Sequence, residues 1–196
     1  MEMKTTATLT AAGLLLLAPM AALAAGNGPR LETHGGQWTG PYVGAQVGFN
    51  QSSSPGLDTQ TSLTGGALGG YNVALPLQGS RAPLILGADV FAEFNSQADH
   101  NRGVRYGTND IGVDVLAGLP LGYRHDFLPF VKVGMGNLSG TGDLGGSDTS
   151  ARIGIGAAFK IQPNLALQAQ WMHQDGDHVT NDNFTVGINY HFALAR

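Results

Sequence analysis

The sequence predicts an all-β protein, an eight-stranded antiparallel up-and-down transmembrane β-barrel. Apolar residues alternate with small or polar ones through eight segments, which is the period of a strand with two unlike faces. Short and long connections alternate between these segments. The chain has 30 glycines, no cysteine and only 12% charged residues. Because every backbone polar group in a membrane needs a partner within the protein, strands can cross it only as a closed barrel.

The N-terminus is typical of a secretory signal. Lys4 precedes an apolar core at 11–18, and Ala22-Leu23-Ala24 is a small-x-small cleavage site, so 1–24 is predicted to be a signal peptide. The alternative, a retained anchor, would need a span of roughly 20 apolar residues. We expect the rest of the chain to comprise a periplasmic leader, the barrel and a short tail, at 25–40, 41–192 and 193–196.

The first four strands are predicted from runs of alternating apolar residues. Their apolar positions are the odd ones of 41–50 and 63–75, the even ones of 83–95 and the odd ones of 110–124. Pro41 is tolerated as the first residue of a strand. Pro120 cannot donate a ladder hydrogen bond, so the regular strand should end or bulge near it.

The last four strands follow the same rule. Their apolar positions are the odd ones of 128–138, 151–161 and 165–173, and the even ones of 183–192. The soluble alternative is a lipocalin-like barrel, with apolar residues inside and charges outside. Its exterior would have to be the face that carries many glycines and few charges, which is too small and sparse to solubilise a barrel.

The connections predict an orientation. Short turns are expected at 125–127 and 162–164, and the connection at 76–82 is longer than a tight turn. Since barrels of this kind have short periplasmic turns and long external loops, both termini should be periplasmic. The predicted outer loops are 51–62, 96–109, 139–149 and 174–182.

The aromatic residues fall at two levels along the predicted strands, as expected of belts at the two membrane interfaces. The outer belt comprises Phe49, Phe94, Trp171 and Phe184. The periplasmic belt comprises Tyr71, Tyr123, Phe159, Tyr190 and Phe192.

Charged residues on the polar faces predict a network in the lumen. An eight-stranded barrel is just wide enough for side chains, so charges there must pair or stay hydrated. We expect Arg152 to pair with Glu93 or Asp114, which favours a plugged lumen over a conducting path. The predicted network is Asp89, Glu93, Asp114, Arg124, Lys132, Arg152 and Lys160.

The histidines raise two further possibilities, a divalent-cation site and a catalytic site. His173, Asp175, Asp177 and His178 could ligate a divalent cation, although such a run is more often a solvated loop. No strand carries a His-x-Ser arrangement, and His191, which should face the lumen, has no serine beside it. The sequence therefore predicts no enzyme, no cofactor and no metal centre.

Several motifs together carry a family resemblance. They are Trp38-Thr39-Gly40-Pro41-Tyr42-Val43-Gly44, Gly69-Gly70-Tyr71-Asn72, Leu86-Gly87-Ala88-Asp89, Leu128-Pro129-Phe130-Val131-Lys132 and the closing strand. In order and spacing they resemble small eight-stranded outer-membrane barrels of the porin-family, opacity-protein-like and alphaproteobacterial major surface antigen type. The resemblance implies an architecture related to the membrane domain of OmpA and a place in the outer membrane of a Gram-negative cell. Within the closing strand, Gly187, Tyr190 and Phe192 resemble the signal that the barrel-assembly machinery reads.

The expected function is a structural, envelope-integrity and surface-interaction role. Members of the resembled family are assigned to envelope integrity, adhesion, immune recognition and haem binding. The alternatives are a narrow passive porin-like channel and a loop-borne receptor for a small ligand such as haem. Expected partners are outer-membrane lipids including lipopolysaccharide, the assembly machinery and a surface ligand bound by the loops. A formal charge of -4 argues against nucleic acid.

Overall fold

A computed structural model describes residues 36–80, 82–99, 103–143, 145–177 and 179–192. The predicted signal peptide, most of the predicted leader and the predicted tail lie outside these residues. Within the described part of the chain, no helix is long and apolar enough to span a membrane.

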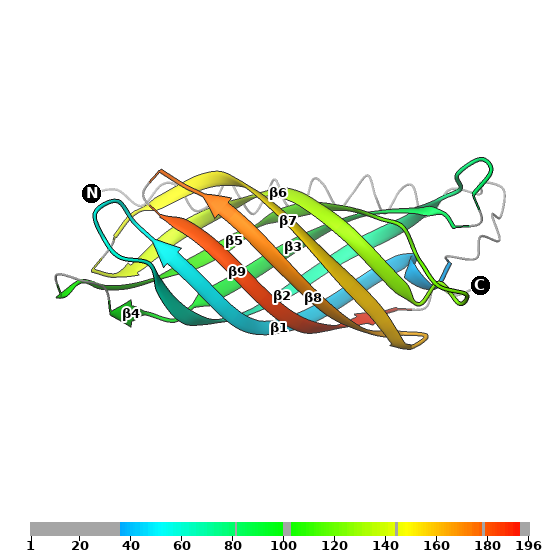
Figure 1. Ribbon diagram of the computed structural model, residues 1–196, viewed down its shortest axis with the longest axis horizontal. Helices are drawn as coiled ribbons and strands as arrows, with labels where there is room; N and C mark the ends of the chain where they lie inside the picture. The colour runs from blue at the N-terminus through cyan, green and yellow to red at the C-terminus, as the bar shows by residue number, and fades with distance from the viewer. Residues whose placement is uncertain (1–35, 81, 100–102, 144, 178, 193–196) are drawn as a thin grey trace. The chain divides into compact units, whose positions relative to one another are not determined.

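The described residues form eight long antiparallel strands that close into a barrel, as predicted (Figure 1). Consecutive long strands pair along the chain, and β1 pairs with β9 to complete the ring. A 3-10 turn, η1 (Gly36–Trp38), precedes the first strand, and the two-residue β4 (Ala98–Asp99) pairs with β5. The long strands are β1 (Gly40–Ser53), β2 (Gln60–Leu75), β3 (Leu84–Asn95), β5 (Arg105–Gly118), β6 (Phe127–Gly142), β7 (Ser147–Gln162), β8 (Leu165–Asp175) and β9 (Thr180–His191).

We name the two ends of the barrel by the predicted connections that they hold, the short turns at one end and the outer loops at the other. The turn end has η1 and the connections 76–83, 119–126 and 163–164, whereas the loop end has 54–59, 96–104, 143–146 and 176–179. All four predicted outer loops were therefore too long. The strands pair beyond the last apolar residue of the alternation, as at Ser52 with Gln60 and Thr108 with Gly140, because backbone pairing does not require an apolar side chain.

The turn after β5 follows from Pro120. The strand ends at Gly118, two residues earlier, which confirms the expected break. The chain then reverses through 119–126 and resumes pairing at Phe127, whose carbonyl accepts a hydrogen bond from Leu121 N at 2.6 Å.

The barrel is apolar outside and charged inside, as predicted. Val47 and Ile155 are 63% and 58% exposed, whereas Asp89 and Lys132 are 2% and 1% exposed. This polarity is the reverse of a soluble barrel and is what hydrocarbon surroundings require.

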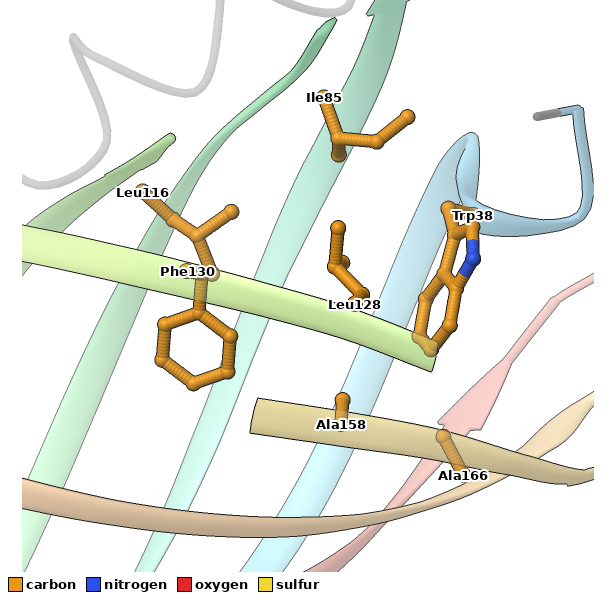
Figure 2. Packing of buried hydrophobic residues seen from close by; sticks show 7 residues of the cluster. All are labelled: Trp38, Ile85, Leu116, Leu128, Phe130, Ala158 and Ala166. Carbon is orange, nitrogen blue, oxygen red and sulfur yellow. The ribbon is translucent and has the colours of Figure 1, made fainter. Parts of the chain in front are cut away.

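The interior at the turn end is apolar, which the sequence pattern did not predict. Seven buried side chains from η1 and five strands pack together there (Figure 2). An eight-stranded barrel has to fill its interior with side chains, and here large inward residues do so at one end. The cluster is Trp38, Ile85, Leu116, Leu128, Phe130, Ala158 and Ala166.

Candidate functional site

The centre of the barrel holds one arginine among three carboxylates. Arg152 on β7 donates from Nη1 and Nη2 to the two carboxylate oxygens of Glu93 on β3, at 3.3 and 3.2 Å. Nη1 also donates to Asp110 at 2.9 Å, and Nε lies 3.2 Å from Asp114 Oδ1. The guanidinium lies 3.7 Å from the ring centroid of Phe91. All of these charged groups are almost fully buried, so they interact in a medium of low dielectric constant.

A second cation lies nearer the turn end. Lys132 Nζ donates to Asp89 Oδ2 at 2.9 Å and lies 4.0 Å from Asp114. The Tyr42 hydroxyl donates to the same oxygen of Asp89 at 2.8 Å. Asp114 therefore links the two cations into one arrangement, which we call the charge cluster: Asp89, Glu93, Asp110, Asp114, Lys132 and Arg152.

Neutral side chains extend the charge cluster toward β1 and β9. Gln46 and Asn183 each donate an amide hydrogen bond of 2.8 Å to Glu93. Gln170 in turn donates to Gln46 Oε1 at 3.0 Å. The hydrogen bonds and ion pairs thus join β1, β3, β5, β6, β7, β8 and β9 across the interior.

Glycines make room for the charged groups. Gly70 and Gly66 lie directly opposite Asp89 and Glu93 across the β2–β3 ladder. Gly134 pairs with Asp114 on one side and with Arg152 on the other. A methyl group at Gly134 would collide with the Asp114 carboxylate and with a backbone carbonyl. At Gly66, Gly70 and Gly134 the missing side chain therefore leaves room for a charged neighbour.

Two residues of the predicted network lie elsewhere. Arg124 is not in the lumen: it lies in the turn 119–126 with its side chain 81% exposed and pairs with Asp126 at 3.3 Å. The predicted strand at 110–124 continued past Pro120, whereas the observed strand ends before it. Arg124 was therefore given an inward direction that it does not have. Lys160 does point inward, but its ammonium donates to the Pro163 carbonyl at 3.3 Å and lies 4.8 Å from the Trp38 ring centroid. It does not reach the carboxylates of the charge cluster.

The N-terminal turn is bonded to the β5–β6 connection. Trp38 Nε1 donates to the His125 carbonyl at 2.7 Å, and Gln37 Nε2 donates to the same carbonyl at 2.7 Å. The Trp38 ring is 1% exposed and meets His191 edge to face at a centroid distance of 5.8 Å. The last residues of the predicted leader therefore close the turn end from inside.

The residues considered for cation binding have separate partners. His173 Nδ1 lies 2.9 Å from Asp182 Oδ1, Asp175 accepts from the Thr180 hydroxyl, and the Asp177 backbone N–H donates to Asp148. His178 lies outside the described residues. Within the described chain, no group of three histidine or acidic residues could hold a metal ion. In the same part of the chain, no serine or threonine hydroxyl is bonded to His173.

The outward aromatic residues lie in cross-strand rows. Phe49 and Trp171 are both neighbours of Phe184 toward the loop end. Phe159 pairs with Phe127 toward the turn end, and Tyr190 packs edge to face on Phe192 at 5.1 Å. Tyr123, expected at the end of a strand, is fully exposed in the turn 119–126. The remaining predicted belt residues, Phe94 and Tyr71, are on outward positions of β3 and β2.

Besides most of the apolar cluster, sequence reasoning left Asp110 out of the charged network and did not place Trp38 in the interior. Asp110 has the same inward parity as Asp114, so the pattern contained the signal that would have added it to the network. Trp38 precedes the first alternating run, and no periodic signal marks it as an interior residue.

Comparisons with known proteins agree with this architecture. A family model described as the outer membrane protein beta-barrel domain matches residues 10–192. A search of curated proteins gives no match.

Solved structures share the fold at low identity. Neisserial surface protein A (NspA) is 16% identical with a TM-score of 0.59, over 79% of this chain and 98% of that chain. Ail, the attachment invasion locus protein of Yersinia pestis, is 14% identical with a TM-score of 0.51, over 79% and 99%. The outer membrane enzyme PagL is 15% identical with a TM-score of 0.50, over 77% and 99%. At such identities the likeness shows the fold alone.

Proposed function

The chain belongs to the outer membrane protein β-barrel domain family, and we propose that this member is a closed, non-conducting and non-enzymatic barrel that supports the envelope and displays its loops at the cell surface. The observation that carries the proposal is the filling of the interior. The charge cluster occupies its middle, and the apolar cluster around Trp38 occupies the turn end. A path for ions would have to displace buried ion pairs and then cross packed hydrocarbon, and both steps are costly.

The orientation that we propose puts the turn end in the periplasm and the loop end outside. The support is the spacing of the apolar runs in the sequence, because the segments 51–62, 96–109, 139–149 and 174–182 are longer than 76–82, 125–127 and 162–164, and the family architecture has short periplasmic turns. The residues outside the strands are similar in number at the two ends. Gly187 and Tyr190 lie in β9 and Phe192 directly follows it, and we propose that the assembly machinery reads these residues. In this orientation a surface ligand would meet 54–59, 96–104, 143–146 and 176–179.

The conductance of a planar bilayer tests the closed lumen. Purified refolded protein should give no reproducible current steps, because the interior is filled at two levels. Steps of constant size that increase in number with added protein would refute the proposal. Their loss in Gly134→Val, which adds volume beside Asp114, would show that the current passes through the lumen, provided that heat-modifiable migration on a gel shows the variant to be folded.

Protease access on intact cells tests the display of the loops. A cleavage site inserted at 56 in the loop end should be cut by external protease, and the same site inserted at 79 in the turn end should be cut only after the outer membrane is permeabilised. Both positions are glycines of positive φ outside the strands, so the two insertions are matched for backbone tolerance. Cleavage at 79 but not at 56 on intact cells would reverse the orientation.

A further inference from the structure

An apolar groove crosses the outer wall of the barrel over β7, β8, β9 and β1. Its part nearer the loop end has a volume of about 460 Å³ and is walled by Phe49, Trp171 and Phe184. It continues without a break into a second part of about 600 Å³ that reaches Phe159 toward the turn end. The two parts share three outward residues, Val47, Ala169 and Val186.

The small side chain of Ala169 produces the groove. It lies between Leu167 and Trp171 along β8, with Val186 beside it on β9 and the equally small Ala157 beside it on β7. This wall faces hydrocarbon in an outer-membrane barrel, so a flexible apolar chain is the chemistry that fits it.

A polar constellation lies directly beyond the loop-end limit of this groove, also on the outward face. Asp182 Oδ1 accepts hydrogen bonds from Trp171 Nε1 at 3.0 Å and from His173 Nδ1 at 2.9 Å. The side chains of His173 and Asp182 are 37% and 32% exposed. In the described part of the chain, Asp182 Oδ2 and His173 Nε2 take part in no hydrogen bond. Two hydrogen-bonding atoms are therefore fixed in place and reachable from outside.

Trp171 connects the polar constellation to the groove. Its ring walls the groove, its N–H orients Asp182, and its centroid lies 6.0 Å from that of His173. A carboxylate and an imidazole beside an indole suit hydroxyl and amide groups of a sugar, whose C–H faces pack on aromatic rings.

We propose that β8 and β9 carry a glycolipid site, in which the Asp182–His173 pair binds the acylated amino sugar and the groove at Ala169 holds one of its acyl chains. The inference rests on the proposed orientation, which puts these residues in the outer leaflet. The site is on the wall of the barrel and uses none of the four loop connections.

Native mass spectrometry of the detergent-purified full protein tests the site. The probes are monophosphoryl lipid A, which is an acylated glucosamine disaccharide, and phosphatidylglycerol. We expect the wild type to bind the lipid A more tightly. Asp182→Ala should weaken that binding about tenfold, since it removes hydrogen bonds to a charged group. Ala169→Phe should weaken it at least as much by filling the groove.

The matched control is Ala92→Phe, an outward alanine of β3 that does not line the groove and pairs with Ala67 and Ile111. It should leave lipid A binding unchanged, and heat-modifiable migration on a gel verifies that every variant is folded. The site is refuted if Ala169→Phe is no weaker than Ala92→Phe, or if Asp182→Ala has no effect. It is also refuted if the wild type binds phosphatidylglycerol as tightly as lipid A. The titration uses no bilayer or current, so failure of the closed-lumen proposal would not affect it.

Discussion

Replacing Arg152 with methionine should lower the free energy of unfolding by about 3–5 kcal/mol, the cost of removing one partner from a buried ion pair. The arginine pairs with three carboxylates, and each carboxylate remains buried after the substitution. Their mutual repulsion then has no opposing charge closer than Lys132, whose nearest carboxylates are Asp89 and Asp114. Urea unfolding of the refolded protein in lipid vesicles measures the loss.

Two further variants show whether charge is the cause. Arg105→Met removes an exposed guanidinium that lies 3.6 Å from Asp99, and it should cost less than about 1 kcal/mol. Neutralising the carboxylates in the same chain, as R152M with E93Q, D110N and D114N, should recover most of the loss. If R152M unfolds within about 1 kcal/mol of wild type, or if the fourfold variant is no more stable than R152M, buried charge pairing does not hold this interior together.

The excess of acid in the charge cluster limits how the interior can be built. Four carboxylates face two cations there, and Oδ1 of both Asp89 and Asp110 is buried without a hydrogen-bond partner among the described residues. Tyr42, Gln46 and Asn183 supply neutral donors to the acids. The interior is therefore stabilised by one guanidinium that contacts three carboxylates, by the ammonium of Lys132 and by neutral donors, so the position of Arg152 matters more than the number of positive charges.

The alternating pattern predicted the wall of the barrel well because a strand has only two faces. The position of Val47 and of Asp89 in the alternation of its own strand is enough to place the first outside and the second inside. No knowledge of the neighbouring strand is needed. The end of the strand near Pro120 was predictable from the local sequence as well, because proline has no backbone N–H to donate to the neighbouring strand. The strand limits at the loop end were not predictable in this way, because the pairing of Ser52 with Gln60 depends on backbone geometry.

The sequence could limit the possible partners of Arg152 to a few residues, but it could not identify the contacts themselves. Parity placed it inward with Glu93 and Asp114, and the structure brings all three together. However, Arg152 and Glu93 lie on β7 and β3, which do not pair, so their contact depends on how the strands are staggered around the barrel. Arg124 was predicted to face the lumen because the alternation was continued past the end of β5. No strand is present there, and Arg124 is exposed.

Replacing Trp38 with alanine should lower the free energy of unfolding by about 3–5 kcal/mol, as expected for truncating a large buried side chain. The ring packs in the apolar cluster at the turn end (Figure 2). It also contacts Lys160 and His191. Its loss also removes the hydrogen bond to the His125 carbonyl, so the connection 119–126 should loosen. Amide hydrogen exchange should therefore become faster in 119–126 and stay unchanged in 54–59, at the other end of the barrel.

Two substitutions separate the packing of Trp38 from its hydrogen bond. Trp38→Phe keeps most of the ring but not the donor, and it should cost about 1 kcal/mol for the hydrogen bond beyond the lost ring volume. Trp171→Ala truncates the same residue type on the outward face, where the lost contacts are partly replaced by lipid, and it should cost less than Trp38→Ala. Equal losses of unfolding free energy in Trp38→Ala and Trp171→Ala, with unchanged amide hydrogen exchange in 119–126, would mean that the N-terminal turn contributes little to the stability of the barrel. The closed turn end would then depend on Leu128 and its neighbours, which pack there without the indole.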